Sequence, residues 1–199
     1  MKTFINFSIA VYVLAGSLLL VIPSGIFPVF YKPTLMASLA FVSAFLIFLP
    51  RIIFRKPVDE KKKRALIKFQ FLITFILLIN GIGGLGLYKL YKIGFEYDKL
   101  MHFVSPLLAV LFGSAFISVW FRKNAKIALV ITVSLILLGG VLWEILEATS
   151  DKFLGTTLLG GGENLIAVDT AKDLFMNVIG TILGAIIFLK KRGLTKKLP

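Results

Sequence analysis

The sequence predicts an all-α polytopic membrane protein, a helix bundle of six spanning helices with both termini in the cytoplasm. Two observations predict this fold class. Hydrophobic residues make up 58% of the 199 residues, above the roughly 45–50% of ordinary soluble domains. These residues gather in six runs, each close to the ~20 residues that cross a bilayer core. The polar stretches between the runs are too short to fold as a soluble core, so we expect a single transmembrane domain over residues 1–199.

The six predicted helices cover residues 4–22, 34–54, 65–88, 102–121, 127–148 and 173–189. We expect helices because lipid cannot satisfy unpaired backbone groups. The third run is the most polar, since it contains Lys68, Gln70 and Asn80, and the sixth is short. The first run is longer than a signal-peptide core and is not followed by a clear A-x-A site, so it reads as a retained helix.

Charge distribution predicts the orientation. The net charge of +13 would suggest nucleic acid binding in a soluble protein, but here Lys and Arg flank membrane helices and meet anionic lipids, so no nucleic acid partner is expected. With a cytoplasmic N-terminus, 17 of the 23 Lys and Arg residues lie inside and 6 outside. The short loops favour a multi-pass protein of a bacterial or archaeal plasma membrane. The chain has no cysteine, which excludes disulfides and thiolate metal sites.

The acidic residues gather on the opposite, non-cytoplasmic side. Eight of the ten lie there, together with the single histidine, His102. The positive-inside rule concerns Lys and Arg and does not explain this clustering. The eight residues are Glu96, Asp98, Glu144, Glu147, Asp151, Glu163, Asp169 and Asp173.

Two of the polar stripes on that side come from the fourth and fifth runs. Asp98 and His102 are four residues apart, so a continuous helix would place them on one face. A helix that starts only at Pro106 is the alternative, and it would leave both residues in a loop. Glu144 and Glu147 are three apart near the end of the fifth run. Glu144 lies inside that end, where an unpaired charge costs about 3 kcal/mol.

The third stripe comes from the sixth run and the residues before it. Asp169, Asp173 and Asn177 are spaced by four, so they share a helix face if the helix begins early enough. Small residues in the fifth and sixth runs allow helices to approach closely; they are Gly139, Gly140, Gly180 and Gly184. The Gly-rich connection over residues 149–172 is long enough to fold as a cap or a re-entrant piece.

Carboxylates with one imidazole suit a divalent cation such as Mg²⁺, Mn²⁺ or Zn²⁺. The candidate metal ligands are Asp98, His102, Asp169 and Asp173 with Asn177 in support, and the candidate catalytic bases are Glu144 and Glu147. A cation there would activate water for hydrolysis or transfer on a lipid-linked or envelope substrate. The partners expected are membrane lipids and such a substrate. Whether the protein is an enzyme stays open at this point.

Two other functions fit the same residues. Carboxylates and an imidazole also relay protons, which predicts a proton- or ion-coupled transporter. The cytoplasmic halves of the last three runs are nearly all apolar residues and glycine, which argues against a continuous polar path. The third reading is a structural or partner-binding protein in which Glu144 pairs with Lys99 or Lys172.

Three segments carry a resemblance to known families: YDKLMH at 97–102, WEILE at 143–147 and VDTAKDLFMNVIG at 168–180. Together they resemble the YjdF-like family of uncharacterised bacterial inner-membrane proteins and, more distantly, the VanZ-like proteins. The resemblance covers residues 97–184. It implies that three elements recur across the family: an Asp followed by a His, an ExxE-like helix and a D-x-x-x-D element. In this chain the first is Asp98 with His102, the second Glu144 with Glu147, and the third Asp169 with Asp173.

The SPLL segment at 105–108 departs from the pattern of that family, in which a Gln-Gly pair is commoner. No substrate is therefore carried over from the resemblance. VanZ-like proteins are linked to glycopeptide (teicoplanin) resistance, so the resemblance implies work on the cell envelope.

Overall fold

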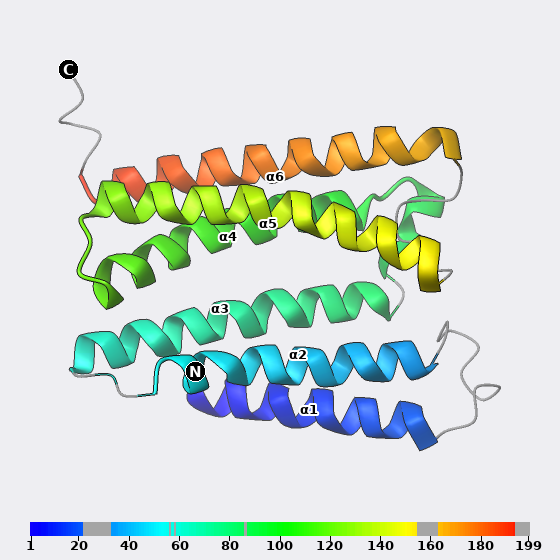
Figure 1. Cartoon of the computed structure of the whole chain (residues 1–199), viewed down its shortest axis with the longest axis horizontal. Coiled ribbons are helices and arrows are strands. Elements are labelled where there is room, and N and C mark those ends of the chain that lie inside the picture. The colour runs from blue at the N-terminus through cyan, green and yellow to red at the C-terminus, as the bar shows by residue number, and fades with distance from the viewer. Residues whose placement is uncertain (22–32, 56, 58, 86, 155–162, 194–199) are drawn as a thin grey trace. The chain divides into compact units, whose positions relative to one another are not determined.

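A computed structural model describes residues 1–21, 33–55, 57, 59–85, 87–154 and 163–193, and the regular elements of this part of the chain are all helices (Figure 1). Six of these helices are long and apolar enough to cross a membrane, which confirms the all-α fold class and the presence of six helices with the length and composition of membrane spans. The elements in order are α1 (Lys2–Val21), α2 (Pro33–Ile53), α3 (Glu60–Gly84), the 3₁₀ helix η1 (Leu87–Ile93), α4 (Tyr97–Trp120), α5 (Ala125–Leu154) and α6 (Glu163–Lys191).

The bounds predicted for the third helix, 65–88, were wrong at both ends. Helix α3 begins at Glu60 because the Asp59 side chain caps it, accepting a hydrogen bond from the Lys62 backbone N–H at 2.8 Å. The basic residues that follow Asp59 therefore form the first turns of α3. At the other end α3 stops at Gly84, and the chain continues as η1.

Helix α4 begins at Tyr97, so Asp98 lies in its first turn and Pro106 lies inside it. The alternative in which the helix starts at Pro106 was wrong, and the predicted start at residue 102 was late. Asp98 and His102 therefore share a continuous helix face. Because Pro106 has no N–H, the His102 carbonyl lacks its usual helical donor.

The stretch over residues 149–172, for which we expected a cap or a re-entrant piece, is helical at both of its ends. Helix α5 runs on to Leu154 and α6 already begins at Glu163, so both ends of this stretch are helical extensions. Residues 155–162 lie outside the described residues. The early start of α6 puts Asp169 and Asp173 on a continuous helix.

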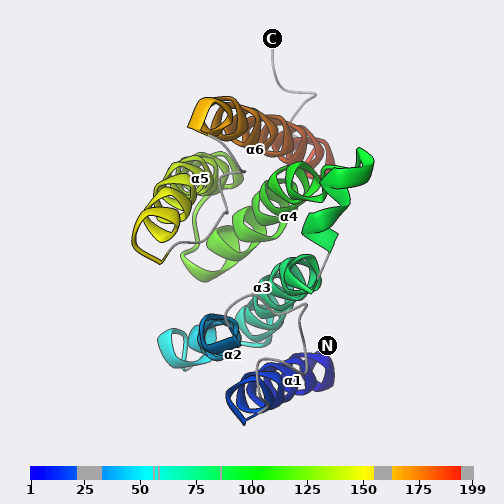
Figure 2. The same ribbon diagram turned by 90° about the vertical axis from the view of Figure 1, so that its right-hand side faces the viewer.

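The chain folds into two compact units, residues 1–95 (unit 1) and residues 96–199 (unit 2). In unit 1, α1, α2 and α3 pack on one another; in unit 2, α4, α5 and α6 do so (Figure 2). Within unit 2 the chain reverses direction at each turn, so α4 and α6 run parallel and α5 runs antiparallel to both (Figure 1). The single domain over 1–199 stays a prediction.

Helices α4 and α6 form the closest pair in unit 2. Gly180 and Gly184, one turn apart on α6, face the α4 backbone. A Cβ at Gly180 would meet the Phe103 carbonyl oxygen, and one at Gly184 would lie 2.8 Å from the Leu107 carbonyl oxygen. This is the close approach that small residues permit. Gly139 does not take part, because nothing lies within 4 Å of a Cβ built there.

Candidate functional site

The three helices of unit 2 bring polar side chains together at the end where α4 and α6 begin and α5 ends. Most of these side chains are buried. The five carboxylates predicted as metal ligands or catalytic bases and the histidine all take part. We call the group the carboxylate cluster; its members are Asp98, Lys99, His102, Glu144, Glu147, Asp169 and Asp173.

Lys99 holds one side of the cluster together, and sequence reasoning missed this role. Its Nζ lies 2.6 Å from Asp169 Oδ1 and 2.7 Å from Asp173 Oδ1, so it joins α4 to α6. A third carboxylate oxygen, Asp98 Oδ2, is 3.4 Å away. The signal was present in the sequence, because Lys99 lies three residues before His102 and shares its helix face.

The predicted ion pairs of Glu144 with Lys99 or Lys172 were wrong. The contacts of Lys99 run to the aspartates instead. Lys172 pairs with Glu96 at 3.7 Å, and both of those side chains are more than half exposed. Among the described residues, no ammonium group therefore forms an ion pair with the Glu144 carboxylate.

The imidazole of His102 lies between two sets of carboxylates. Its Nε2 is 3.6 Å from Asp98 Oδ1 and 3.9 Å from Asp173 Oδ1. Its Nδ1 is 3.9 Å from Glu144 Oε1. These separations are longer than hydrogen bonds, so each ring nitrogen faces a carboxylate across a small gap.

Glu144 and Glu147 of α5 differ in their partners. Glu147 Oε1 accepts a hydrogen bond from Trp143 Nε1 at 2.7 Å. Glu144 is only 5% exposed, and within the described residues neither of its oxygens has a hydrogen-bond partner. Thr170 of α6 lies beside the Glu144 carboxyl group, but the contact does not meet hydrogen-bond geometry. A buried carboxylate in this state needs a proton or a cation.

Two sets of donor atoms in the described part of the chain lie close enough together to surround a cation, each within 4.8 Å. One consists of Asp98, His102 and Asp173, and the other of His102, Glu144 and Glu147. Asp169 belongs to neither set and is bonded to Lys99. His102 is common to both sets because its two nitrogens point in different directions.

Asn177, the predicted supporting ligand, is also outside both sets. It is buried one turn deeper on α6 than Asp173. Its Nδ2 lies 2.8 Å from the place where a Cβ on Gly140 would be. Gly140 thus makes room for Asn177, and the amide packs between α5 and α6.

Buried hydroxyl groups extend the polar interior of unit 2 beyond the cluster. Ser114, Thr132 and Thr181 are all buried, although these helix halves read as apolar in the sequence. Thr132 donates to the Ala128 carbonyl at 2.7 Å. Ser114 Oγ and Thr181 Oγ1 have no hydrogen-bond partner in the described residues. The helical spacing carries the signal for Thr181, which follows Asn177 by four residues.

The charge of the cluster does not balance. It contains five carboxyl groups, one ammonium group and one imidazole. The ammonium group of Lys99 already forms ion pairs with the aspartates. The carboxyl groups around His102 therefore require protons or a further cation if they are to stay buried.

A family model of predicted membrane proteins, DUF2238, matches residues 9–192. The chain belongs to the DUF2238 family. The match reaches from α1 to the end of α6 and so extends well beyond residues 97–184, on which the YjdF-like resemblance depended. No curated protein and no solved structure matches the chain. Membership in this family supports the assignment of the chain as a membrane protein, and the description of the family names no activity.

Proposed function

We propose that unit 2 binds a divalent cation on the non-cytoplasmic side of a bacterial or archaeal plasma membrane and uses it on a lipid-linked or envelope substrate. The observation that supports this proposal most strongly is the unpaired state of the Glu144 carboxylate in the described part of the chain. This carboxylate is buried without a hydrogen bond in the described residues and lies 3.9 Å from His102 Nδ1. A cation bound by both groups would provide the missing partner.

The ligands we propose are His102, Glu144 and Glu147. Asp169 and Asp173, predicted as ligands from their spacing, give oxygens to Lys99 instead. The donor atoms of the chosen set lie within 4.8 Å of one another, so small side-chain movements would bring them to the ~2.0–2.2 Å that Zn²⁺ requires. One imidazole with carboxylates also suits Mn²⁺.

The other side of the imidazole supports this assignment. Asp98 and Asp173 face Nε2 of His102. Metal-binding histidines usually direct their second nitrogen toward a carboxylate, which fixes the ring and strengthens it as a ligand. Lys99 in turn holds Asp173 in place.

Such a site suits hydrolysis or transfer on a polar headgroup. The cation would polarise the scissile bond and make bound water acidic. Glu144 and Glu147 act as ligands in this arrangement, so the role of base passes to Asp98, whose side chain is 34% exposed. A headgroup would enter past Asp98 while its lipid chain stays among the apolar helices.

The orientation rests on unit 2 alone. The carboxylate cluster lies at the end where α4 and α6 begin. The opposite end of the unit carries basic residues on α5, on α6 and in the turns next to the helices: Arg122, Lys123, Lys126, Lys190, Lys191 and Arg192. The positive-inside rule supports a cytoplasmic location for the basic end, where α6 ends. An envelope-facing site also agrees with the relationship we infer to YjdF-like and VanZ-like proteins.

Metal-dependent thermal stability tests this proposal. Detergent-purified wild type is compared with Glu144→Gln, with and without Mn²⁺ or Zn²⁺, and the metal content of each is measured. The control is Glu96→Gln, the same chemical change at an exposed carboxylate of unit 2. We expect metal to raise the Tm of the wild type and the control but not of Glu144→Gln. Equal shifts in all three proteins, or no shift in the wild type, would contradict the proposal.

Proton-coupled transport is the second candidate, and the buried hydroxyls favour it. Ser114 and Thr181 lie deeper in unit 2 than the cluster, with hydroxyls that lack a partner in the described residues. They could bind water and extend the polar path past Asn177. Proteoliposomes with an internal pH dye would decide, because a proton flux that Glu144→Gln abolishes would favour transport over the enzyme.

A further inference from the structure

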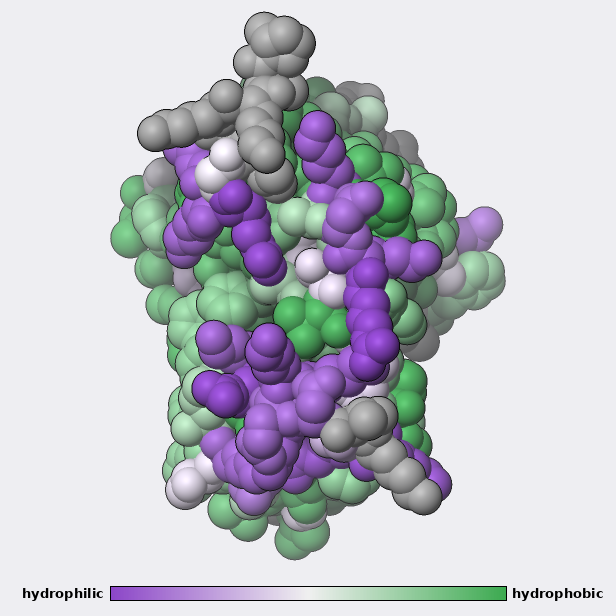
Figure 3. All heavy atoms as spheres, turned by 90° about the vertical axis from the view of Figure 1, so that its left-hand side faces the viewer, coloured by the Kyte–Doolittle hydropathy of each residue, from purple (hydrophilic) through white to green (hydrophobic). Residues whose placement is uncertain are grey.

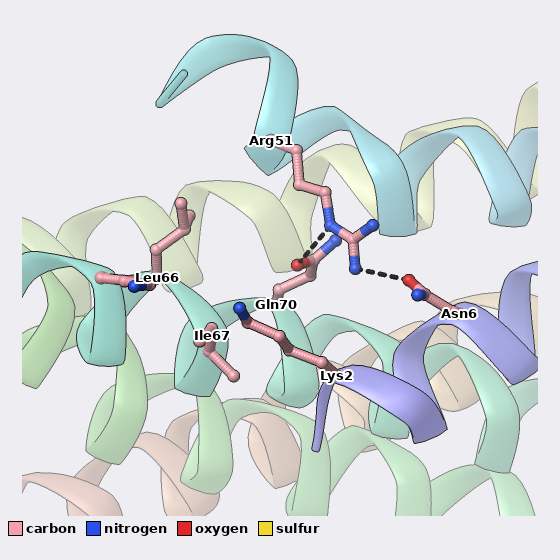
Figure 4. Close-up of a pocket in the computed structure, with 7 residues that line it drawn as sticks. Lys2, Asn6, Arg51, Leu66, Ile67 and Gln70 are labelled. Carbon is pink, nitrogen blue, oxygen red and sulfur yellow. Dashed lines mark hydrogen bonds between the residues drawn. The ribbon is translucent and has the colours of Figure 1, made fainter. Parts of the chain in front are cut away.

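Unit 1 contains a cavity of about 280 Å³ at the end where α1 and α3 begin and α2 ends (Figure 4). Three cationic side chains and two amide side chains line it, and two aliphatic side chains complete the wall. The polar lining residues are Lys2, Asn6, Arg51, Lys63 and Gln70. Hydrophilic residues crowd this end of unit 1, in the lower half of Figure 3.

Two hydrogen bonds hold the Arg51 side chain in place in this cavity. Its Nε donates to Gln70 Oε1 at 3.1 Å, and its Nη2 donates to Asn6 Oδ1 at 2.7 Å. Gln70 is 2% exposed, and its Nε2 donates to the Ile47 carbonyl at 2.7 Å, which turns its oxygen toward Arg51. Both partners are neutral, so the guanidinium is oriented while its charge has no ion-pair partner in the described part of the chain.

The other charges of the cavity leave it positive. Lys2 and Lys63 add two ammonium groups to the guanidinium of Arg51. The carboxylate beside them is Glu60, which is bonded to Lys63 at 2.8 Å and is largely exposed. The described residues that line the cavity include no acidic side chain. An anion therefore has a preformed place to bind.

We propose that this cavity binds the phosphate of an anionic phospholipid headgroup. A planar guanidinium matches phosphate oxygens with paired donors. Arg51 lies in the last turn of α2 and Lys2 at the start of α1, the depth at which headgroups meet a spanning helix. Leu66 and Ile67 of α3 line the cavity and give an acyl chain an apolar surface. Free phosphate shares the chemistry but lacks that chain.

Titration of full-length protein in detergent tests the proposal. The probes are dihexanoyl-phosphatidylglycerol, dihexanoyl-phosphatidylcholine and inorganic phosphate, each followed by calorimetry. We expect phosphatidylglycerol to bind at least tenfold more tightly than either other probe. Phosphatidylcholine binding as tightly would overturn the proposal. Inorganic phosphate binding as tightly would overturn the lipid as the source of the phosphate and assign the cavity to the free anion.

Substitutions place the binding in the cavity. Arg51→Gln should weaken phosphatidylglycerol binding about tenfold, whereas Arg55→Gln, at an exposed cation outside the cavity, should leave it unchanged. If Arg51→Gln does not fold, the exposed pair Lys2→Gln with Lys63→Gln serves instead and should weaken binding severalfold. Wild-type affinity in these cavity variants would overturn the assignment.

Discussion

The two units treat their buried polar groups in opposite ways. In unit 1, Ser8, Gln70 and Thr74 are buried and each donates to a backbone carbonyl. In the described part of the chain, every buried side-chain polar atom without a hydrogen bond lies in unit 2. One of these, Asp173 Oδ1, is still compensated by its ion pair with Lys99.

This difference indicates where each unit meets its ligand. Unit 1 satisfies its buried groups internally and keeps uncompensated charge, which is positive, at an open cavity. Unit 2 keeps an acidic group, Glu144, inside the bundle without a hydrogen-bond partner in the described residues. Buried polar groups cost stability unless they are paired, so the unmet groups of unit 2 are the place where a bound ion would contribute most.

Lys99→Met should produce the largest loss of stability. It removes the ammonium group from two carboxylates of α6 and leaves Asp173 buried without compensation, which costs about 3–5 kcal/mol for broken buried pairs. Thermal unfolding in detergent measures the effect. Lys172→Met, at the exposed pair with Glu96, is the control and should cost less than about 1 kcal/mol. Similar values of Tm for both variants would contradict the prediction that the buried ion pairs stabilise the protein more than the exposed pair.

Gly180→Ala should have an intermediate effect. The added methyl group would collide with the Phe103 carbonyl oxygen and push α4 and α6 apart, at a cost of about 1–3 kcal/mol for overpacking. Gly139→Ala makes the same change where nothing lies within 4 Å. There alanine should be neutral or stabilising, because it is the better helix former. Equal destabilisation at both positions would contradict the α4–α6 packing.

Removal of buried hydroxyls should have the smallest effect and gives the sharpest comparison between the units. Ser114→Ala removes a hydroxyl with no partner in the described residues, so stability should stay the same or rise slightly, because an unpaired buried hydroxyl lowers it. Thr74→Val in unit 1 removes the hydrogen bond to the Gln70 carbonyl and should cost about 1 kcal/mol. A reversed order, measured by thermal unfolding, would show that the Ser114 hydroxyl is satisfied after all.

Much of the fold could be predicted from the sequence because apolar run length decides where a chain crosses a bilayer. The acidic members of the carboxylate cluster and His102 were also predictable, although Lys99 was not, since spacings of three and four place Asp98 with His102 and Glu144 with Glu147 on one helix face. The ends of the helices could be predicted less well. Asp59 shows the reason, because its capping side chain sets the start of α3 at Glu60, earlier than the apolar run begins.

The pairing inside the cluster could not be predicted. Lys99 and Asp173 are 74 residues apart in the chain, and their contact depends on the rotation of α6 against α4. Gly180 and Gly184 fix that rotation by packing on the α4 backbone. When this rotation is unknown, spacing alone predicts the aspartates of α6 as metal ligands. In the structure they form ion pairs with Lys99.

The most direct test of the central claim is the coordination of Mn²⁺ by unit 2. Electron spin-echo spectroscopy of Mn²⁺ bound to the detergent-purified protein should show coupling to one imidazole nitrogen. This coupling should disappear in His102→Gln and persist in Asp169→Asn, because Asp169 is bonded to Lys99 and lies outside both candidate ligand sets. Protein-bound Mn²⁺ without nitrogen coupling, or coupling that survives in His102→Gln, would contradict a cation site at His102, Glu144 and Glu147.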